Sequence, residues 1–164
     1  MKSNKTGVIV IDMQADYIGE KSKHQYYSQS LIDKINNRID TAAKQDEIII
    51  YVKNVGRRNK EPYICEFVDG LSVVSDFIVE KEKASIFSNT TLLDILKRNE
   101  IINIEIIGID GNCCVASSAI DASKLGFCVK LPLDYIGIKS EDRFRKTREK
   151  LLKANVQIVE YFEG

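Results

Sequence analysis

The sequence has few of the residues that hold metal ions, and it carries no net charge. It contains one histidine, and its four cysteines show no Cys-x-x-Cys spacing, so a structural zinc site is not expected. Twenty-four basic residues balance twenty-four acidic ones, which leaves no overall field to attract nucleic acid or a membrane surface. We therefore predict no cofactor, no nucleic-acid partner and no membrane partner.

Long apolar segments are also missing. No run approaches the roughly 20 residues that span a bilayer, and the first seven residues, MKSNKTG, lack the apolar core of a signal peptide. The cysteines do not form the disulfide framework of a small secreted domain either. We therefore expect a cytoplasmic protein. At 164 residues with 44% apolar content, the chain suits a single domain, residues 1–164.

Six short runs rich in Val and Ile alternate with stretches of helical period. The runs are mostly apolar without alternation, as in strands that are covered on both faces. They lie at 7–12, 46–53, 76–80, 102–109, 127–131 and 156–161, and the helical stretches lie at 28–45, 90–99, 114–125 and 140–154. This order predicts an α/β fold, a doubly wound three-layer sandwich around a six-stranded, mainly parallel sheet. The long gap at 54–75, which Gly and Pro interrupt, predicts a wall or lid over a functional site.

Three chemically active side chains follow the ends of predicted strands. Asp12 closes the first strand, Lys81 closes the segment FIVEK, and Cys114 comes shortly after the fourth strand. Because the carboxyl ends of parallel strands share one edge, the carboxylate, the amine and the thiol can meet in one crevice. Lys83 is the alternative lysine, since it has the same strand parity, but the spacing to the segment Ser-Ile-Phe at 85–87 favours Lys81.

These three groups suffice to build a cysteine nucleophile. A helix N-terminus and a nearby ammonium both favour a thiolate, and Cys114 is expected to have both. Asp12 is the natural acceptor for the thiol proton and later the acid that protonates a leaving amine. The positive charge of Lys81 keeps Asp12 and the thiolate in place. Substrate-binding candidates follow the same strand ends, although the aromatic ones also suit simple packing; they are Gln14, Tyr17 and Phe87.

The other cysteines have simpler interpretations. Cys128 lies within an apolar strand and is predicted to belong to the core. Cys113, beside the nucleophile, is interpreted as a packing residue, with a redox partner as the alternative. Cys65 lies in the long gap, where it either lines the pocket or has no role in it.

Three motifs resemble those of the isochorismatase-like cysteine hydrolases. IDMQADY at 11–17 is similar to D-x-Q-N-D-F, and GIDGNCCV at 108–115 is similar to G-V-x-T-D-x-C-V. KEKASIF at 81–87, followed by Thr90 and Leu92, is similar to K-x-x-x-S-A-F-x-x-T-x-L. The matches occur in the right order, and their flanking elements cover nearly the whole chain. The resemblance implies a six-stranded parallel sheet and hydrolysis by an Asp-Lys-Cys triad, here Asp12, Lys81 and Cys114.

The resemblance also implies how the reacting carbonyl oxygen is held. It places a cis peptide bond between Ile109 and Asp110 and an oxyanion hole at the backbone N–H groups of Asp110 and Cys114. Oligomers are usual in the family, so a homodimer or a higher homo-oligomer is expected. Gly111 and Asn112 depart from the pattern, because they replace a threonine and an aspartate and so remove a donor and a charge from the turn.

The sequence thus predicts a hydrolase of a small-molecule amide or related C–N bond that works through a thioester. Nicotinamidases of the family carry an Asp-x-His and a further His after the second strand, whereas this chain has YVKNVGRRNK at 51–60 and His24 as its one histidine. Members that hydrolyse the vinyl ether of isochorismate commonly lack the cysteine, so Cys114 favours C–N cleavage. Two alternatives remain: a non-catalytic binding protein on the same fold, and a redox sensor that uses Cys113 and Cys114.

Overall fold

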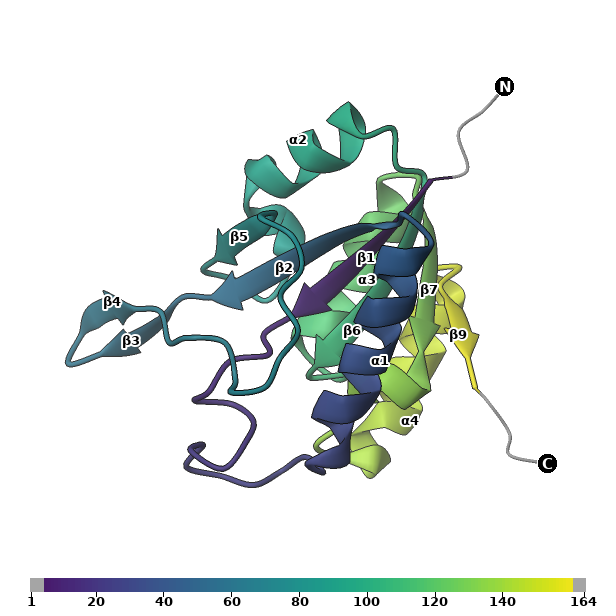
Figure 1. Cartoon of the computed structure of the whole chain (residues 1–164). Helices are drawn as coiled ribbons and strands as arrows, with labels where there is room; N and C mark the ends of the chain where they lie inside the picture. The colour runs from purple at the N-terminus through teal and green to yellow at the C-terminus, as the bar shows by residue number, and fades with distance from the viewer. Residues whose placement is uncertain (1–4, 161–164) are drawn as a thin grey trace.

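A central sheet with helices on both faces makes up the computed structural model, which describes residues 5–160 (Figure 1). Its main strands follow the order β5-β2-β1-β6-β7-β9, and all neighbours pair in parallel. The strands are β1 (Thr6–Ile11), β2 (Ile48–Asn54), β5 (Ile78–Lys81), β6 (Asn103–Ile109), β7 (Cys128–Pro132) and β9 (Gln157–Val159). A two-residue strand, β8 (Ile136–Gly137), pairs with the end of β6. The predicted doubly wound α/β sandwich is confirmed.

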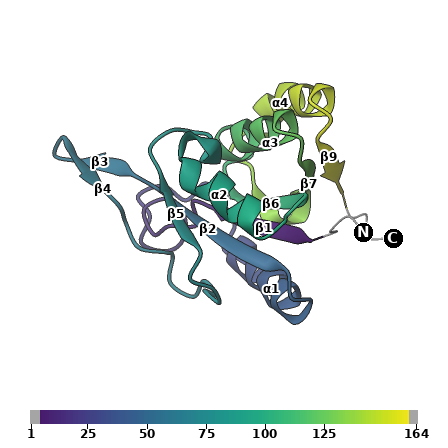
Figure 2. The ribbon, with the colours of Figure 1, turned by 90° about the horizontal axis from the view of Figure 1, so that it is seen from above.

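The helices divide between the two faces of the sheet, as the view from above shows (Figure 2). Helix α1 (Ser30–Lys44) covers one face, and α2 (Thr90–Arg98), α3 (Cys114–Lys124) and α4 (Glu141–Lys153) cover the other. Successive strand residues point to opposite faces. In β1, Val8 and Val10 accordingly pack on the side of α1, while Ile9 and Ile11 pack on the side of the other three helices. The central strands β1, β2 and β6 are therefore mostly apolar on both faces, whereas β5 and β7 nearer the edges alternate between buried and exposed residues.

The segment between β2 and β5 differs from the featureless gap that the sequence predicts. It holds an antiparallel hairpin of β3 (Gly56–Arg58) and β4 (Glu61–Tyr63), which projects from the body at the left of Figure 1. Strands of three residues carry too little pattern to be recognised. The rest of the segment lies against the chain that follows β1, since the N–H of Val68 donates to Met13 and the N–H of Ala15 donates to Glu66. This part does form a wall beside the end of β1.

The prediction of a core role for Cys128 is wrong. Cys128 is exposed at the start of β7, where Val129 and Leu131 point into the core and Cys128 and Lys130 point out. The strand runs near the edge of the sheet, so one of its faces is less covered than the sequence suggests.

Gly108 provides a first test of the fold, because the backbone of β1 leaves no space for a side chain there. Its φ is +118°, and a Cβ at this position would lie 2.2 Å from the backbone oxygen of Ile11. Gly108→Ala is therefore expected to lower the free energy of unfolding by about 3 kcal/mol or more, measured by urea denaturation. Gly70→Ala is the matched control, since φ is +89° but nothing lies within 4 Å; there we expect about 1–2 kcal/mol. Equal losses in the two variants would contradict this account.

Candidate active site

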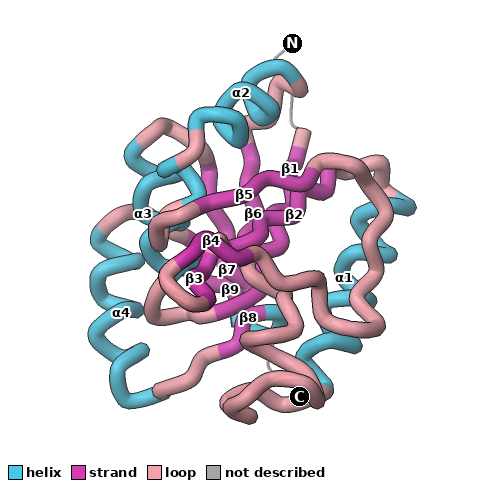
Figure 3. The backbone as a smooth tube through the Cα atoms, turned by 90° about the vertical axis from the view of Figure 1, so that its left-hand side faces the viewer, coloured by secondary structure: helices cyan, strands magenta, loops and turns pink. Residues whose placement is uncertain are grey.

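The three side chains predicted from the strand ends lie at one edge of the sheet. Asp12 directly follows β1, Lys81 is the last residue of β5, and Cys114 is the first residue of α3, just beyond β6. Figure 3 looks onto this side of the molecule, where the loops that follow the strands lie between α1 and the helices of the opposite face. The parallel topology thus brings together residues that are separated by as many as 102 positions, as sequence numbers 12 and 114 show.

Lys81 contacts both of the other groups. Its Nζ lies 3.3 Å from Oδ2 of Asp12 and 3.3 Å from Sγ of Cys114. Lys81 is 2% exposed and Asp12 is 5% exposed, so water screens their interaction little. Lys83, the alternative lysine, is exposed. The structure therefore brings Asp12, Lys81 and Cys114 into one cluster with the ammonium at its centre.

A fourth residue, Asn54, completes the surroundings of the ammonium. Lys81 donates to Oδ1 of Asn54 at 3.0 Å, so each of its three N–H groups has a partner among Asp12, Asn54 and Cys114. The amide nitrogen of Asn54 donates to the hydroxyl of Tyr17 at 3.1 Å. Sequence reasoning missed Asn54, although it is the polar residue that ends β2 and therefore lies at the same edge of the sheet.

Gln14 is fully buried and holds the end of β2 in place. Its amide donates to the backbone carbonyls of Asn54 at 3.2 Å and Cys65 at 3.1 Å, and its oxygen accepts from the N–H of Asn54 at 2.7 Å. Gln14 thus positions the residue that supports Lys81. Phe87 lies in a short 3₁₀ turn, η1 (Ile86–Ser88), and stacks on Phe127 at a centroid distance of 6.2 Å. Tyr17, the third predicted pocket residue, lines the cleft described below.

The turn between β6 and α3 is built around the backbone and side chain of Asp110. The peptide bond between Ile109 and Asp110 is cis. The carbonyl of Asp110 accepts from the N–H groups of Cys113 and Val115, at 3.0 and 3.1 Å. For the N–H groups of Asp110 and Cys114, residues 5–160 offer no backbone acceptor outside the regular strands and helices. These two donors are the pair that the family resemblance implies for an oxyanion hole.

The side chain of Asp110 braces this turn from within and ties two other segments to it. Its Oδ1 accepts from the N–H of Asn112 at 2.8 Å, and its Oδ2 accepts from the Tyr27 hydroxyl at 2.9 Å and from the N–H of Lys139 at 2.7 Å. Burial and the negative charge of Asp110 raise the pKa of Tyr27, which therefore stays protonated and keeps donating.

The two departures from the family pattern have structural roles. A Cβ on Gly111 would lie 2.8 Å from Ile138 and 3.2 Å from Ile136, so the space of a larger residue is already filled. The side-chain amide of Asn112 donates to the carbonyl of Ser140 at 2.9 Å and accepts from the Thr147 hydroxyl at 2.7 Å. Asn112 therefore anchors the turn to α4 without the charge of an aspartate.

The thiol of Cys114 is protonated in the resting protein, contrary to the expectation of a thiolate from the sequence. Burial raises its pKa, the negative charge of Asp12 raises it further, and Lys81 offsets part of the rise. Burial also raises the pKa of Asp12, which Lys81 lowers in part. The sequence shows the helix N-terminus and the ammonium, but not how deeply the group is buried. The thiol consequently keeps its proton at neutral pH until a base removes it.

Asp12 is placed to be that base. Its Oδ2 contacts Lys81, while its Oδ1 is buried and has no hydrogen-bond donor within the described part of the chain. A buried carboxylate oxygen without a donor is unfavourable unless it takes a proton or meets a substrate. The cluster can therefore pass a proton from the thiol to Asp12.

A cleft of about 600 Å³ opens beside the turn between β6 and α3, the candidate catalytic turn. Asp16 and Tyr17 line it from the segment after β1, and Asp110, Asn112 and Cys113 line it from the turn. Cys113 is exposed there, so its interpretation as a packing residue is wrong.

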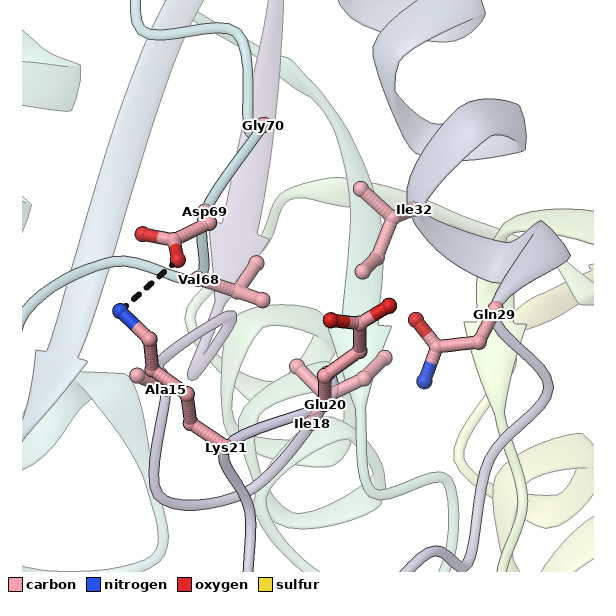
Figure 4. Close-up of a pocket in the computed structure, with 10 residues that line it drawn as sticks. Ala15, Ile18, Glu20, Lys21, Gln29, Ile32, Val68, Asp69 and Gly70 are labelled. Atoms are coloured by element: carbon pink, nitrogen blue, oxygen red, sulfur yellow. Dashed lines mark ion pairs between the residues drawn. The ribbon is translucent and has the colours of Figure 1, made fainter.

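A second cavity, of about 350 Å³, lies between α1 and the loops at 15–21 and 68–70 (Figure 4). Ile18, Ile32 and Val68 point into it, and Lys21 pairs with Asp69 at 2.9 Å at its rim. Unlike the 600 Å³ cleft, which Asp110, Asn112 and Cys113 line beside Cys114, it contains no residue of the turn between β6 and α3, so chemistry at the thiol would not use it.

Residues 5–160 contain no group of three or more His, Cys, Asp or Glu side chains that could hold a metal ion. Within the same residues, no helix is long and apolar enough to cross a membrane.

Comparison with known proteins identifies what this arrangement is similar to. The model of the isochorismatase domain matches residues 6–159. An isochorismatase-like hydrolase from Alkaliphilus metalliredigens shares 23% identity at a TM-score of 0.83, over 95% of this chain and 94% of that one. N-carbamoylsarcosine amidase from Thermoplasma acidophilum shares 19% sequence identity at a TM-score of 0.81, over 98% of this chain and 99% of that one. Pyrazinamidase of Pyrococcus horikoshii, in complex with zinc, shares 22% sequence identity at a TM-score of 0.81, over 96% of this chain and 99% of that one. The search of curated proteins gave no match.

Proposed function

Because the chain belongs to the isochorismatase family, whose members include hydrolases of amide and other C–N bonds, we propose that it hydrolyses a small amide or carbamoyl compound with Cys114 as the nucleophile. The observation that carries the proposal is the contact of Lys81 with both Asp12 and Cys114, at 3.3 Å each. A buried ammonium between a carboxylate and a thiol stabilises the negative charge on whichever group has lost the shared proton. Such a cluster suits a proton transfer that creates a nucleophile.

In the first step Asp12 takes the proton of Cys114, and the sulfur attacks the carbonyl carbon of the bound amide. The electron pair of the C=O bond moves to oxygen, which becomes an oxyanion. The N–H groups of Asp110 and Cys114 are the proposed donors to it, and one such donor is worth about 3–4 kcal/mol in known hydrolases. Lys81 stays protonated and balances the negative charge that moves from Asp12 to the sulfur and then to the oxyanion.

In the second step the oxyanion collapses, the C–N bond breaks and Asp12 gives its proton to the leaving nitrogen. Ammonia or an amine departs, and the acyl group remains on Cys114 as a thioester. Asp12 then takes a proton from water, whose oxygen attacks the thioester carbonyl. The C–S bond breaks, the thiol regains its proton and the product leaves as a carboxylic acid.

Two of the similar structures support the choice of C–N bonds. Their names, pyrazinamidase and N-carbamoylsarcosine amidase, describe hydrolases of an amide and of a carbamoyl compound. The proposal is tested by incubating the protein with a panel of primary amides and N-carbamoyl compounds and measuring ammonia. Release of ammonia that requires Cys114 supports it, and a panel without turnover would refute it.

Removal of metal ions is expected to leave the hydrolysis unchanged. The proposed steps use only Asp12, Lys81, Cys114 and backbone donors, and the chain has one histidine, His24, which is exposed. Ammonia release is measured before and after dialysis against a chelator, with metal content determined in parallel. A loss of activity that added zinc or manganese restores would show that a metal takes part.

The redox sensor remains a second candidate because Cys113 is exposed next to Cys114. The two functions are separated by turnover. A hydrolase releases ammonia under reducing conditions, whereas a sensor releases none and gains a sulfenic acid or disulfide when peroxide oxidises the thiol.

A further inference from the structure

The cleft beside the catalytic turn has one aromatic wall and one basic wall. The aromatic wall comes from the loop after β1, where the rings of His24 and Tyr26 stack at 5.1 Å and Tyr27 meets Tyr26 edge-on at 6.4 Å. The basic wall comes from the chain that enters α4, with Lys139 and Arg143. The ammonium of Lys139 lies 3.9 Å from the ring centroid of Tyr26, so the two walls touch.

Neither cation of this wall has a carboxylate partner. Within residues 5–160, no ion pair involves Lys139 or Arg143. Two carboxylates also line the cleft: Asp110, which accepts three hydrogen bonds from neutral donors, and Asp16, which lies 3.9 Å from Arg58. The lining as a whole therefore carries two positive and two negative charges, and the positive charge is confined to the wall formed by Lys139 and Arg143.

The position of Arg143 adds to this charge. It lies in the first turn of α4, where the helix dipole is positive and a cation is unfavourable. The N-cap residue Ser140, which also lines the cleft, already accepts from the N–H of Arg143 at 3.3 Å. Glu141 and Asp142 share this first turn but do not line the cleft, so an anion in the cleft would be attracted by Lys139, by Arg143 and by the end of the helix.

We propose that this cleft binds the anionic end of the substrate, a carboxylate on a flat aromatic body whose amide or carbamoyl group reaches Cys114. Lys139 and Arg143 are then the residues that select charge, and Tyr26 and Tyr27 pack on the flat body. The part of the proposal that concerns the amide rests on the proposed function. The selection of an anion does not, because it depends only on the charges and rings of the cleft.

Selection of charge is tested with two alkylating reagents that differ only in charge. The anionic reagent is 4-(iodoacetamido)benzoate, and its neutral analogue of nearly the same shape is 4-(iodoacetamido)benzamide. Rate constants at Cys114 are measured for each, with tandem mass spectrometry to distinguish Cys114 from Cys113. The ratio of the two rate constants cancels any general change in the reactivity of the thiol.

In the wild-type protein the anionic reagent is expected to react faster and to saturate. In the double variant Lys139→Gln with Arg143→Gln, the ratio should fall by about fivefold or more, since each exposed charge pair contributes up to about a factor of five. Arg145→Gln is the matched control, because Arg145 is an exposed cation on the same helix that does not line the cleft. It should leave the ratio unchanged.

The outcomes separate this inference from the proposed function. An equal ratio in the wild type and the double variant, or no preference for the anion in the wild type, would overturn the inference. The hydrolase proposal is tested separately by ammonia release from 4-carbamoylbenzoate and from neutral 4-methylbenzamide. Charge-selective labelling without ammonia from either amide would refute the hydrolase and leave the anion site standing. Turnover of both amides at rates that the double variant leaves unchanged would support the hydrolase and refute the anion site.

Discussion

Cys114→Ala is expected to abolish amide hydrolysis, with a loss of roughly a thousandfold or more in kcat. Without the sulfur no thioester can form, and none of the neighbouring side chains can replace it, because Asp12 and Lys81 are engaged with each other. Cys114 starts α3 and is only partly buried, so the alanine variant should remain folded. Steady-state ammonia release and thermal unfolding measure the two effects.

Cys128→Ala is the control for that experiment. Cys128 is exposed on β7, and it lines none of the surfaces around the catalytic turn. Its removal should change neither kcat nor the unfolding temperature appreciably. Full activity in Cys114→Ala, or an equal loss in both variants, would show that the thiol of Cys114 is not the nucleophile.

Asp12→Asn is expected to have two opposite effects. Turnover should fall by roughly a hundredfold to ten-thousandfold, because the variant has no base to accept the thiol proton and no acid for the leaving nitrogen. Alkylation of Cys114 by iodoacetamide at neutral pH should become faster. The negative charge of Asp12 raises the pKa of the thiol, and without it the ammonium of Lys81 favours the thiolate.

Asparagine is the suitable replacement at this position. Asp12 has a φ of +57°, a left-handed conformation that asparagine tolerates better than most residues. Lys81 would keep Asn54 as an acceptor, which limits the cost of losing the carboxylate. The pH dependence of alkylation and the rate of ammonia release are measured on the same preparation. Slower alkylation in the variant, or unchanged turnover, would mean that Asp12 does not control the thiol proton.

The meeting of Asp12, Lys81 and Cys114 could be predicted because it follows from topology. Apolar runs without alternation indicate a parallel sheet, and a parallel sheet places the residues that end its strands at one edge. Asn54 was as accessible to this reasoning, since it ends β2, but an asparagine carries no chemical signal of its own. Its role depends on its contact with Lys81, which no spacing reveals.

The protonation state of Cys114 could not be predicted from the chain. The sequence shows the two features that favour a thiolate, the start of a helix and a lysine. It does not show that burial and Asp12 act in the opposite direction and outweigh them. Long-range packing decides the balance of these effects, and packing is not a property of local pattern.

The roles of Gly111 and Asn112 were likewise invisible in the sequence. As departures from a motif they suggested lost function. The structure shows instead that Ile136 and Ile138 occupy the space beside Gly111 and that Asn112 bonds to Ser140. The residues that fill the space beside Gly111 and bond to Asn112 come from β8 and the start of α4, more than 20 positions further along the chain.

The most direct test of the account is to trap the thioester. The protein is mixed with an amide that releases ammonia, the reaction is quenched with acid within one turnover, and the peptide containing Cys113 and Cys114 is sequenced by mass spectrometry. The account predicts the mass of the acyl group on Cys114, formed together with the first equivalent of ammonia and lost when the carboxylic acid appears. Ammonia release without an acyl group on Cys114 at any time, or an acyl group on Cys113 alone, would contradict it.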